Sequence, residues 1–511
     1  MDLADLQFES NFVRELPADP VPANVPRQVR NASYTRVAPT PVSAPRLLAW
    51  SDALGGYLRI SRPSPEAIEV LAGNKVLPGM QPYAARYGGH QFGVWAGQLG
   101  DGRAITLGEV IAADGARQEL QLKGAGRTPY ARTADGRAVL RSSLREFLCS
   151  EAMHFLGVPT TRALSLVATG DAVRRDMFYD GNPQDEPGAV VCRVAPSFVR
   201  FGNFQIHVAL GEEEPLKRLH SYVVRNYYPD HEHDWFHVLC QRTALLIADW
   251  MRLGFVHGVM NTDNMSILGI TIDYGPYGWL EGYDPSWTPN TTDAGTRRYC
   301  YGNQPEIALW NLARLAEALL PLQEKEHLEA GLALYAQTYE DAMRNALAQK
   351  LGFASLVEAG DDELIGDFFK VLAATETDWT LFCRNLARIE ETQDEAALVA
   401  PLEPAFYTEV GTDHRANLVA WLRRYLARVN REAPGRAERM NRVNPKYVPR
   451  NYLAQEAIDA IEQRGDTSVL ERLMKVLERP YDEQPENQDL AARRPEWARN
   501  RPGCSALSCS S

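Results

Sequence analysis

A polar loop and the short acidic motif after it carry the most specific signal for the fold of this chain. The loop reads His257-Gly258-Val259-Met260-Asn261-Thr262-Asp263-Asn264, and Asp273-Tyr274-Gly275 begins nine residues after it. Asn264 and Asp273 carry the hard oxygen donors that a magnesium ion prefers. The sequence therefore predicts that this loop and the motif after it form one metal-binding site.

The spacing within the loop is that of a protein-kinase catalytic loop. In the kinase pattern H-R-D-L-x-x-x-N the histidine and the asparagine are seven residues apart, as His257 and Asn264 are. Val259 stands where kinases carry the catalytic aspartate, and a valine cannot accept a proton. Asp263 is the nearest carboxylate that could serve instead. The loop is thus compatible with an enzyme whose base has moved, or with a scaffold that binds a nucleotide without reacting.

A lysine and a glutamate upstream extend the kinase pattern. The segments 104–111 and 118–123 predict a β-hairpin, and Lys123 ends its second strand. Glu146 comes early in a helix that Ser142-Ser143 can cap and that Gly157 ends. In kinases, a lysine on a strand and a glutamate on the next helix hold the phosphates. Spacing alone leaves a second interpretation open, in which Ser143 and Glu146 form a capping box.

Glycines, arginines and histidines supply weaker signals. The run Gly97-Gln98-Leu99-Gly100-Asp101-Gly102-Arg103 could bring backbone amides close to phosphates, although it matches no standard phosphate-binding motif and also suits an ordinary turn. Arg193 and Arg200, at the two ends of a strand-like segment, could clamp phosphates, although isolated arginines are usually surface residues. The histidines at 231, 233 and 237 indicate only a polar helix start.

Composition excludes several classes of protein. The chain has 511 residues, of which 45% are hydrophobic and 23% charged, as in a folded globular protein. A net charge of −12 argues against a nucleic-acid partner, since phosphate neutralisation needs a basic face. No run approaches the ~18 apolar residues of a membrane span, and the acidic N-terminus lacks a signal-peptide pattern. Seven widely spaced cysteines form no disulfide or zinc pattern, so a cytoplasmic location is expected.

The order of elements predicts an α+β fold with two lobes, like that of protein kinases. The Pro-rich residues 1–80 predict an extended arm with one short helix near Ser64. A strand-rich lobe is expected at 81–205 and a helical lobe at 206–435, which contains a long helical pattern from Trp235 to about Leu253 and short strands at 267–268 and 271–273. Residues 436–511 predict a mainly helical C-terminal extension whose tail is of a redox type.

Longer strings make the comparison with a known family specific. They are Tyr87-Gly88-Gly89-His90-Gln91-Phe92-Gly93, Leu122-Lys123-Gly124-Ala125-Gly126-Arg127-Thr128-Pro129-Tyr130, Met260-Asn261-Thr262-Asp263-Asn264-Met265-Ser266, Asp273-Tyr274-Gly275-Pro276 and Asn444-Pro445-Lys446-Tyr447. From about Tyr87 to the C-terminus the chain resembles the selenoprotein O family. The resemblance implies a protein adenylyltransferase that binds ATP inverted relative to ordinary kinases. AMP would pass to a Ser, Thr or Tyr hydroxyl of a protein, and pyrophosphate would leave.

The same resemblance implies roles for individual residues. The implied nucleotide contacts are Gly100, Gly102, Arg103, Lys123, Asp135, Gly136, Arg193, Arg200 and Asp273. Lys123 would pair with Glu146, and the two arginines would bind the far phosphates where a kinase holds adenine. Asn264 and Asp273 would bind Mg²⁺ or Mn²⁺, and Asp263 would be the proton acceptor. Transfer of another nucleotide, such as UMP with Mn²⁺, and a pseudokinase scaffold stay open as alternatives.

The C-terminal tail resembles the family as well. In that family a cysteine or selenocysteine near the chain end takes part in a redox link to the segment after the metal-binding aspartate. The corresponding residue here is Cys509. This chain departs from the pattern, because no cysteine lies between Asp273 and Asn290 and the nearest candidate partner is Cys300. A disulfide between Cys509 and Cys300 is therefore a hypothesis.

Overall fold

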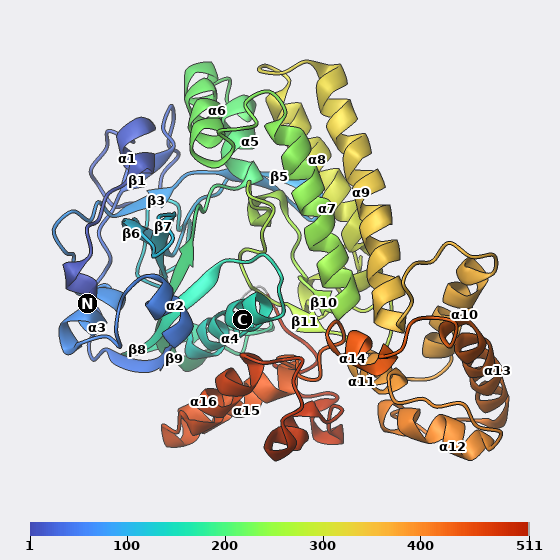
Figure 1. Cartoon of the computed structure of the whole chain (residues 1–511). Coiled ribbons are helices and arrows are strands. Elements are labelled where there is room, and N and C mark those ends of the chain that lie inside the picture. Colours follow the sequence, from blue (N-terminus) through green and yellow to red (C-terminus); the bar gives the residue numbers. More distant parts are fainter. Residues whose placement is uncertain (509–511) are drawn as a thin grey trace.

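The structure, a computed structural model, describes residues 1–508. Figure 1 shows a sheet-based lobe in blue and teal, a helical lobe from green to orange, and the red helices α15 and α16 beneath them. The sheet is antiparallel, with seven strands in the order β1-β3-β6-β7-β9-β8-β2. These strands are β1 Tyr34–Arg36, β2 Arg46–Trp50, β3 Tyr83–Ala85, β6 Ala104–Ile111, β7 Arg117–Lys123, β8 Arg162–Arg175 and β9 Gln184–Ala195.

The central strands separate apolar from charged side chains. The predicted hairpin is confirmed as β6 and β7, in which Lys123 lies opposite Ala104. Leu120 and Leu122 are fully buried in the core of the sheet lobe. Gln121 and Lys123 alternate with these leucines, and Gln121 lies opposite Arg193 of β9. The face of β7 and β9 away from this core therefore carries the charged residues.

The first 80 residues, predicted as an extended arm, are built into the sheet lobe. They supply both edge strands, β1 and β2. They also form the helices η1 Leu3–Asp5, α1 Asn11–Glu15, α2 Asp52–Tyr57 and α3 Pro65–Leu71. The Ser64 hydroxyl caps α3 by accepting a hydrogen bond from the Ala67 amide, which confirms the helix predicted there.

Helix α4, Leu140–Phe155, begins before the predicted cap. Its N-cap residue, Val139, offers no side-chain hydrogen bond, and Ser143 lies within the first turn. The capping-box interpretation of Ser143 and Glu146 is therefore wrong. The helix packs on β8 and β9, so its position is set by tertiary contacts rather than by a local cap.

The helical lobe surrounds the polar loop. Helix α7, Trp235–Leu253, has the predicted bounds and ends at Gly254. The loop forms the short helix η2, Thr262–Asn264, and a two-stranded ribbon joins β10 Phe255–Val256 to β11 Gly278–Trp279. The strands predicted at 267–268 and 271–273 are wrong, because that segment makes only isolated bridges to Arg200 and Thr160.

The remaining helices complete the lobe and the C-terminal extension. Those of the lobe are α5 Phe201–Ala209, α6 Glu213–Tyr227, α8 Gln304–Leu319, α9 Lys325–Leu351, α10 Asp361–Ala373, α11 Trp379–Leu386, α12 Glu395–Val399 and α13 Thr412–Val429, with the short η3 Thr291–Asp293, η4 Tyr301–Asn303 and η5 Ala400–Ala405. The extension has α14 Arg436–Asn441, α15 Asn451–Arg464, α16 Ser468–Leu477, η6 Pro485–Ala491 and η7 Glu496–Ala498. Helices α15 and α16 share one buried cluster with α4. The predicted α+β two-lobed fold with a helical extension is confirmed.

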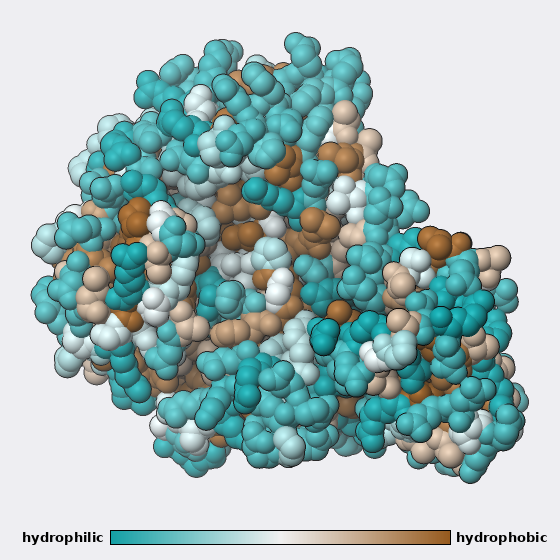
Figure 2. All heavy atoms as spheres, viewed as in Figure 1, coloured by the Kyte–Doolittle hydropathy of each residue, from teal (hydrophilic) through white to brown (hydrophobic). Residues whose placement is uncertain are grey.

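The two lobes meet around a hollow. Figure 2 shows it near the centre of this face, where apolar side chains are visible inside a mostly hydrophilic surface. The hairpin of β4 Gly88–Gln91 and β5 Val94–Gln98 is separate from the large sheet and packs on α5 and η2. Within residues 1–508, no helix combines the length and the apolar character needed to cross a membrane.

Candidate active site

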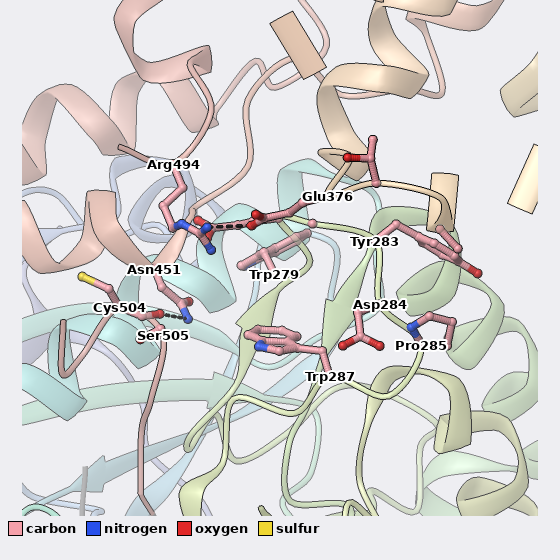
Figure 3. Close-up of a pocket in the computed structure, with 14 residues that line it drawn as sticks. Trp279, Tyr283, Asp284, Pro285, Trp287, Glu376, Asn451, Arg494, Cys504 and Ser505 are labelled. Atoms are coloured by element: carbon pink, nitrogen blue, oxygen red, sulfur yellow. Dashed lines mark hydrogen bonds and ion pairs between the residues drawn. The ribbon is translucent and has the colours of Figure 1, made fainter. Parts of the chain in front are cut away.

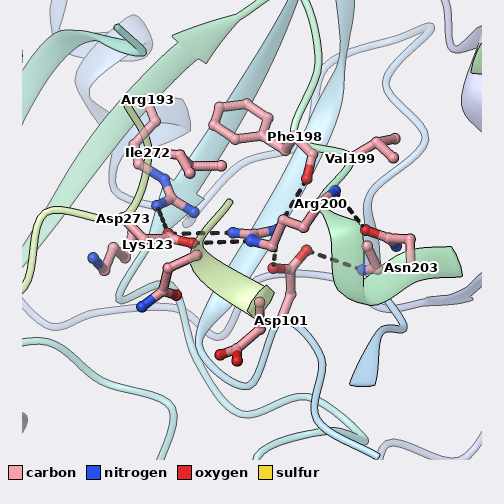
Figure 4. Close-up of polar contacts among 12 residues, drawn as sticks. Asp101, Lys123, Arg193, Phe198, Val199, Arg200, Asn203, Ile272 and Asp273 are labelled. Carbon is pink, nitrogen blue, oxygen red and sulfur yellow. Dashed lines mark hydrogen bonds and ion pairs between the residues drawn. The ribbon is translucent and has the colours of Figure 1, made fainter. Parts of the chain in front are cut away.

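Charged side chains from both lobes converge between the sheet and the loop after η2, and Figure 4 shows five of them: Asp101, Lys123, Arg193, Arg200 and Asp273. We call Asp101, Lys123, Glu146, Arg193, Arg200 and Asp273 the charge cluster. Lys123 Nζ lies 2.5 Å from Glu146 Oε2, so the strand lysine and the helix glutamate form the predicted ion pair. Glu146 Oε1 also lies 3.2 Å from Arg193 Nη1. The glutamate thus fixes two cations of the sheet lobe.

Asp273 is the anion on which the two arginines converge. Its carboxylate accepts hydrogen bonds from Arg193 Nη1 at 2.6 Å and from Arg200 Nε at 2.9 Å. Burial alone would raise the pKa of Asp273, but Arg200, Arg193 and Lys123 hold it well below its usual range. Its backbone has a φ of 59°, a left-handed conformation that is uncommon outside glycine and concentrates at functional sites.

Asp101 and Gln121 join the cluster although the sequence did not single them out as site residues. Asp101 is buried and lies 3.5 Å from Arg200 Nη1, and its carboxylate also accepts from the Ala85 amide at 3.0 Å. The Gln121 side-chain oxygen accepts from Arg193. The available signals in the sequence were an acid within the glycine-rich turn, Asp101, and a polar residue between two leucines of a predicted strand, Gln121.

Arg103 is a further cation beside the charge cluster, and it differs from the others in its contacts. Within the described residues its guanidinium makes no hydrogen bond or ion pair, although its charge acts on Lys123 and Asp135. Burial lowers the pKa of Arg103. With Arg103 counted, four cations face the three carboxylates of the cluster. The site is therefore prepared for an additional anion.

The predicted glycine contacts lie on two neighbouring loops. Gly100 and Gly102 connect β5 to β6 and pack against Tyr130 and the residue after it. Gly136 accepts a backbone hydrogen bond from Gly126 at 3.1 Å, so the second loop folds back on itself. Asp135, exposed on this loop, lies 2.7 Å from Arg175. The two loops flank the end of β7 that carries Lys123.

The polar loop has a rigid frame. His257 is buried, stacks on Trp250 with ring centroids 5.3 Å apart, and hydrogen-bonds the Ile272 carbonyl through Nε2 at 2.9 Å. Burial lowers the pKa of His257. The Asn264 amide donates to the Val259 carbonyl at 2.9 Å. The histidine thus ties the loop to the segment that ends in Asp273.

Asp263 stands apart from the charge cluster in its surroundings. It is buried, and its Oδ2 accepts one side-chain hydrogen bond, from Gln91 Nε2 at 3.2 Å. Its Oδ1 has no hydrogen-bond partner among residues 1–508. Burial raises the pKa of Asp263 to about 7. The structure therefore contains a carboxylate with one unsatisfied oxygen beside the metal-ligand candidate Asn264.

Comparison with known proteins gives this arrangement a family. Residues 24–478 match the family described as "Protein adenylyltransferase SelO". The chain belongs to the SelO family. It is 61% identical to "Protein nucleotidyltransferase YdiU" of Nitrosospira multiformis, over the whole chain and 97% of that protein. Proteins of the same name from Aromatoleum aromaticum and Rhodopirellula baltica are 56% and 54% identical, with at least 99% of each chain covered. The predicted family is thus confirmed, as is the enzyme class, a nucleotidyltransferase that uses ATP.

The donors of this SelO-family chain suit a magnesium ion that takes its other ligands from phosphates and water. Because the Asn264 amide nitrogen is used by Val259, its carbonyl oxygen is left as an acceptor. Asp273 adds carboxylate oxygens. No group of three or more His, Cys, Asp or Glu side chains in residues 1–508 forms a complete metal cage. Magnesium commonly binds through one or two carboxylates and the substrate phosphates, so these residues fit it.

Of the two cysteines in the redox hypothesis, the structure describes Cys300. Cys509 lies outside the described residues. Cys300 is a buried free thiol, and burial raises its pKa. The tail before Cys509 lies along the segment after the Asp273 motif, where Leu507 hydrogen-bonds Pro289 and Thr291 through backbone atoms. The disulfide between Cys509 and Cys300 stays a prediction.

A second cavity, of about 450 Å³, lies outside the charge cluster (Figure 3). Trp279, Trp287 and the tail residue Cys504 contribute to its wall. Arg494 spans it, with hydrogen bonds to Glu281 at 3.0 Å and Glu376 at 2.8 Å. The described residues that line this cavity include none of the predicted site residues, so it is separate from the candidate active site.

Proposed function

We propose that this enzyme transfers AMP from ATP to Ser, Thr or Tyr hydroxyls of proteins and releases pyrophosphate, with ATP inverted relative to ordinary kinases. The observation that carries the proposal is the position of Arg193 and Arg200. Both are at most 2% exposed, so they form the buried part of the site. Both arginines are paired with Asp273, but with Arg103 the site holds one more cation than carboxylates, so phosphate oxygens gain charge-assisted hydrogen bonds here that a neutral purine cannot form. The phosphate end of ATP is therefore favoured at this deep position.

The resident residues divide the work of the reaction. Lys123, Arg193 and Arg200 hold the β- and γ-phosphates, and Glu146 keeps the lysine and one arginine in place. Arg103, whose charge acts on Lys123, supplies a positive charge that no carboxylate among residues 1–508 pairs with. In this orientation the α-phosphate faces the polar loop. Nucleotidyl transfer requires mainly such positioning and charge neutralisation.

Asp263 is proposed as the proton acceptor. Its carboxylate takes the proton of the acceptor hydroxyl while the hydroxyl oxygen forms a bond to the α-phosphorus. The bond between the α-phosphorus and the oxygen that bridges to the β-phosphate breaks, and pyrophosphate leaves. Asn264 and Asp273 would hold Mg²⁺ or Mn²⁺, which when bound neutralises charge on the phosphates. Val259 fits this scheme, because an inverted nucleotide does not need a base at the kinase position.

A paired labelling assay tests the proposal. Purified protein is incubated under reducing conditions with Mg²⁺ or Mn²⁺ and with ATP labelled at either the α- or the γ-phosphate, and Asp273→Ala is run alongside. We expect protein to gain label only from the α position, and only with wild type. Mass spectrometry of the labelled peptides then identifies the acceptor hydroxyl.

Other outcomes would contradict specific parts of the proposal. Label from the γ position would mean ordinary kinase chemistry and refute the inverted nucleotide. Faster labelling from α-labelled UTP than from ATP would change the transferred group to UMP. ATP binding without label from either position would indicate a scaffold.

A further inference from the structure

We infer that Gln91 is a positioning residue that orients Asp263 toward the acceptor hydroxyl. This inference rests on the proposed role of Asp263 as proton acceptor. It concerns the β4–β5 hairpin, which carries none of the residues assigned so far to the nucleotide or the metal. The hairpin reaches the polar loop from the side of the sheet lobe, and its strand β4 runs directly past Asp263.

Alternation along β4 places two residues on the face toward Asp263. Gln91 donates through Nε2 to Asp263 Oδ2 at 3.2 Å. A carboxylate can only accept, so the amide must present its NH₂ group here. Gly89, two residues earlier, lies so close that a Cβ at this position would collide with Asp263 Oδ1. One face of the strand thus supplies both the donor and the space for the carboxylate.

The hairpin is fixed to the polar loop, so the Gln91 contact has a rigid support. The His90 amide donates to Thr262 Oγ1 at 2.7 Å, and that hydroxyl donates to Gln205 Oε1 at 2.7 Å. The Gln205 amide group then lies 3.3 Å from His90 Nδ1. These contacts close a ring that joins the hairpin, η2 and α5. A rigid support is what a positioning residue needs in order to hold its partner within a narrow range of angles.

The tip of the hairpin is strained in a way that strengthens this docking. Phe92 has a φ of 51°, a left-handed conformation that is unfavourable for a bulky side chain. Its amide lies 2.9 Å from the Tyr299 hydroxyl and 3.2 Å from Asn261 Oδ1. Because Asn261 is two residues before Asp263, the strained turn is held by the same loop that carries the acid. Strain of this kind persists where the surrounding structure over-determines it.

The consequence for the reaction is directional. Gln91 holds Oδ2 of Asp263 through a hydrogen bond, and Oδ1 is buried against Gly89, so the hairpin fixes the plane of the carboxylate from two sides. The carboxylate can then rotate away from the hydroxyl only by breaking its hydrogen bond. Loss of the Gln91 amide should therefore slow the chemical step and leave nucleotide binding unchanged, because Gln91 makes no contact with the charge cluster.

The test compares Gln91→Met with a matched variant, Gln98→Met. Gln98 lies on the partner strand of the same hairpin but hydrogen-bonds Val29 and Arg27 instead of Asp263. We expect Gln91→Met to lower kcat for AMP transfer about tenfold, the effect of one lost charge-assisted hydrogen bond, with the KM for ATP and the melting temperature unchanged. Gln98→Met should keep the wild-type kcat. In an Asp263→Asn background, Gln91→Met should cause no further loss.

Several results would overturn the inference. They are an unchanged kcat in Gln91→Met, a change confined to the KM for ATP, an equal loss in Gln98→Met, or a further tenfold loss in the Asp263→Asn background. Crystal structures of wild type and Gln91→Met give a readout that does not depend on activity. If wild type transfers no AMP, the proposed function fails. The role of Gln91 in the reaction then fails with it, although rotation of the Asp263 carboxylate in the variant would still show that Gln91 orients this side chain. An unchanged carboxylate orientation refutes the inference whether or not wild type is active.

Discussion

The charge cluster and the surroundings of Asp263 are built on opposite principles. In the charge cluster each carboxylate meets at least one cation, and Asp273 alone meets two arginines. Asp263 has one donor, Gln91, and otherwise lies against backbone and glycine. The side chains of the charge cluster are fixed by ion pairs between residues that lie far apart in the sequence. The Asp263 carboxylate is instead fixed by its packing against the β4–β5 hairpin.

The two regions meet different requirements: the charge cluster suits binding of the nucleotide phosphates, and the surroundings of Asp263 suit proton transfer. Paired charges hold their geometry and can exchange one partner for a phosphate without leaving an ion unpaired in a buried site. A base needs a carboxylate that is not neutralised by a cation and that keeps a lone pair for the proton. Changes in the two regions should therefore have similar effects on activity and different effects on stability.

The largest effect is expected for Asp273→Asn. Removing this charge should lower AMP transfer by at least ~10³-fold, because one candidate metal ligand and the anchor of two arginines are lost together. It should also destabilise the fold by about 3 kcal/mol, since Arg193 and Arg200 are left undercompensated in a buried site. Activity with α-labelled ATP and thermal melting measure the two effects. An unchanged melting temperature would contradict the structural role of this ion pairing.

Asp263→Asn should give a large loss of activity without the loss of stability. The asparagine cannot accept the proton, so AMP transfer should fall by ~10²-fold or more. The melting temperature should stay the same or rise, because a buried carboxylate with few partners is replaced by a neutral side chain of the same shape. Binding of ATP, measured by calorimetry, should be retained. A melting temperature as low as that of Asp273→Asn would remove the contrast between the two regions.

Arg103→Met tests the contribution of the charge cluster to ATP binding separately from its contribution to stability. This arginine has no partner among the described residues, so its removal breaks no ion pair. We expect ATP affinity to fall about tenfold through loss of one charge-assisted contact, with an unchanged melting temperature. Calorimetric titration with ATP measures the change. Lys217→Met, at an exposed position on α6, is the control and should bind ATP like wild type.

The smallest effect is expected from an ion pair that lies outside both regions. Glu212 pairs with Arg86 at 2.8 Å and with His207. Burial alone would raise the pKa of Glu212, but these hydrogen bonds hold it at about 2, below its ordinary 4.5. The stabilisation is therefore complete above pH 4.5 and is lost as the pH falls from 4.5 toward 2. Thermal melting across this window should fall more steeply for wild type than for Glu212→Gln, and equal slopes would contradict the assignment.

The sequence predicted the parts of the structure that depend on local pattern and on motifs with fixed roles. Lys123 and Glu146 are paired as their order on a strand and the next helix indicated. Helix α7 and the β6–β7 hairpin follow from periodicity and turn residues. The α+β class follows from the order of these elements. In each case the signal lies within a short segment or in the kinase-like spacing.

The parts that were missed depend on tertiary contacts. Asp101 becomes part of the site only because Arg200 reaches it from the other end of the sheet. The strands expected at 267–268 and 271–273 do not form, because that segment is fixed by His257 and isolated bridges rather than by a partner strand. Gln91 lies within the Tyr87–Gly93 string that carries the family resemblance, but only the folded hairpin shows that its side chain reaches Asp263.

The contact between the hairpin and α5 has a consequence for laboratory evolution of this enzyme. A Cβ at Gly202 would collide with the Gly88 carbonyl, so neither backbone can give way without moving the hairpin that reaches Asp263. A mutant library should keep these two glycines constant and vary Val94 at the hairpin tip, which is 70% exposed. Substitutions that displace the hairpin from Asp263 would then be avoided at the design stage, and diversity would be concentrated at an exposed position that no buried contact constrains.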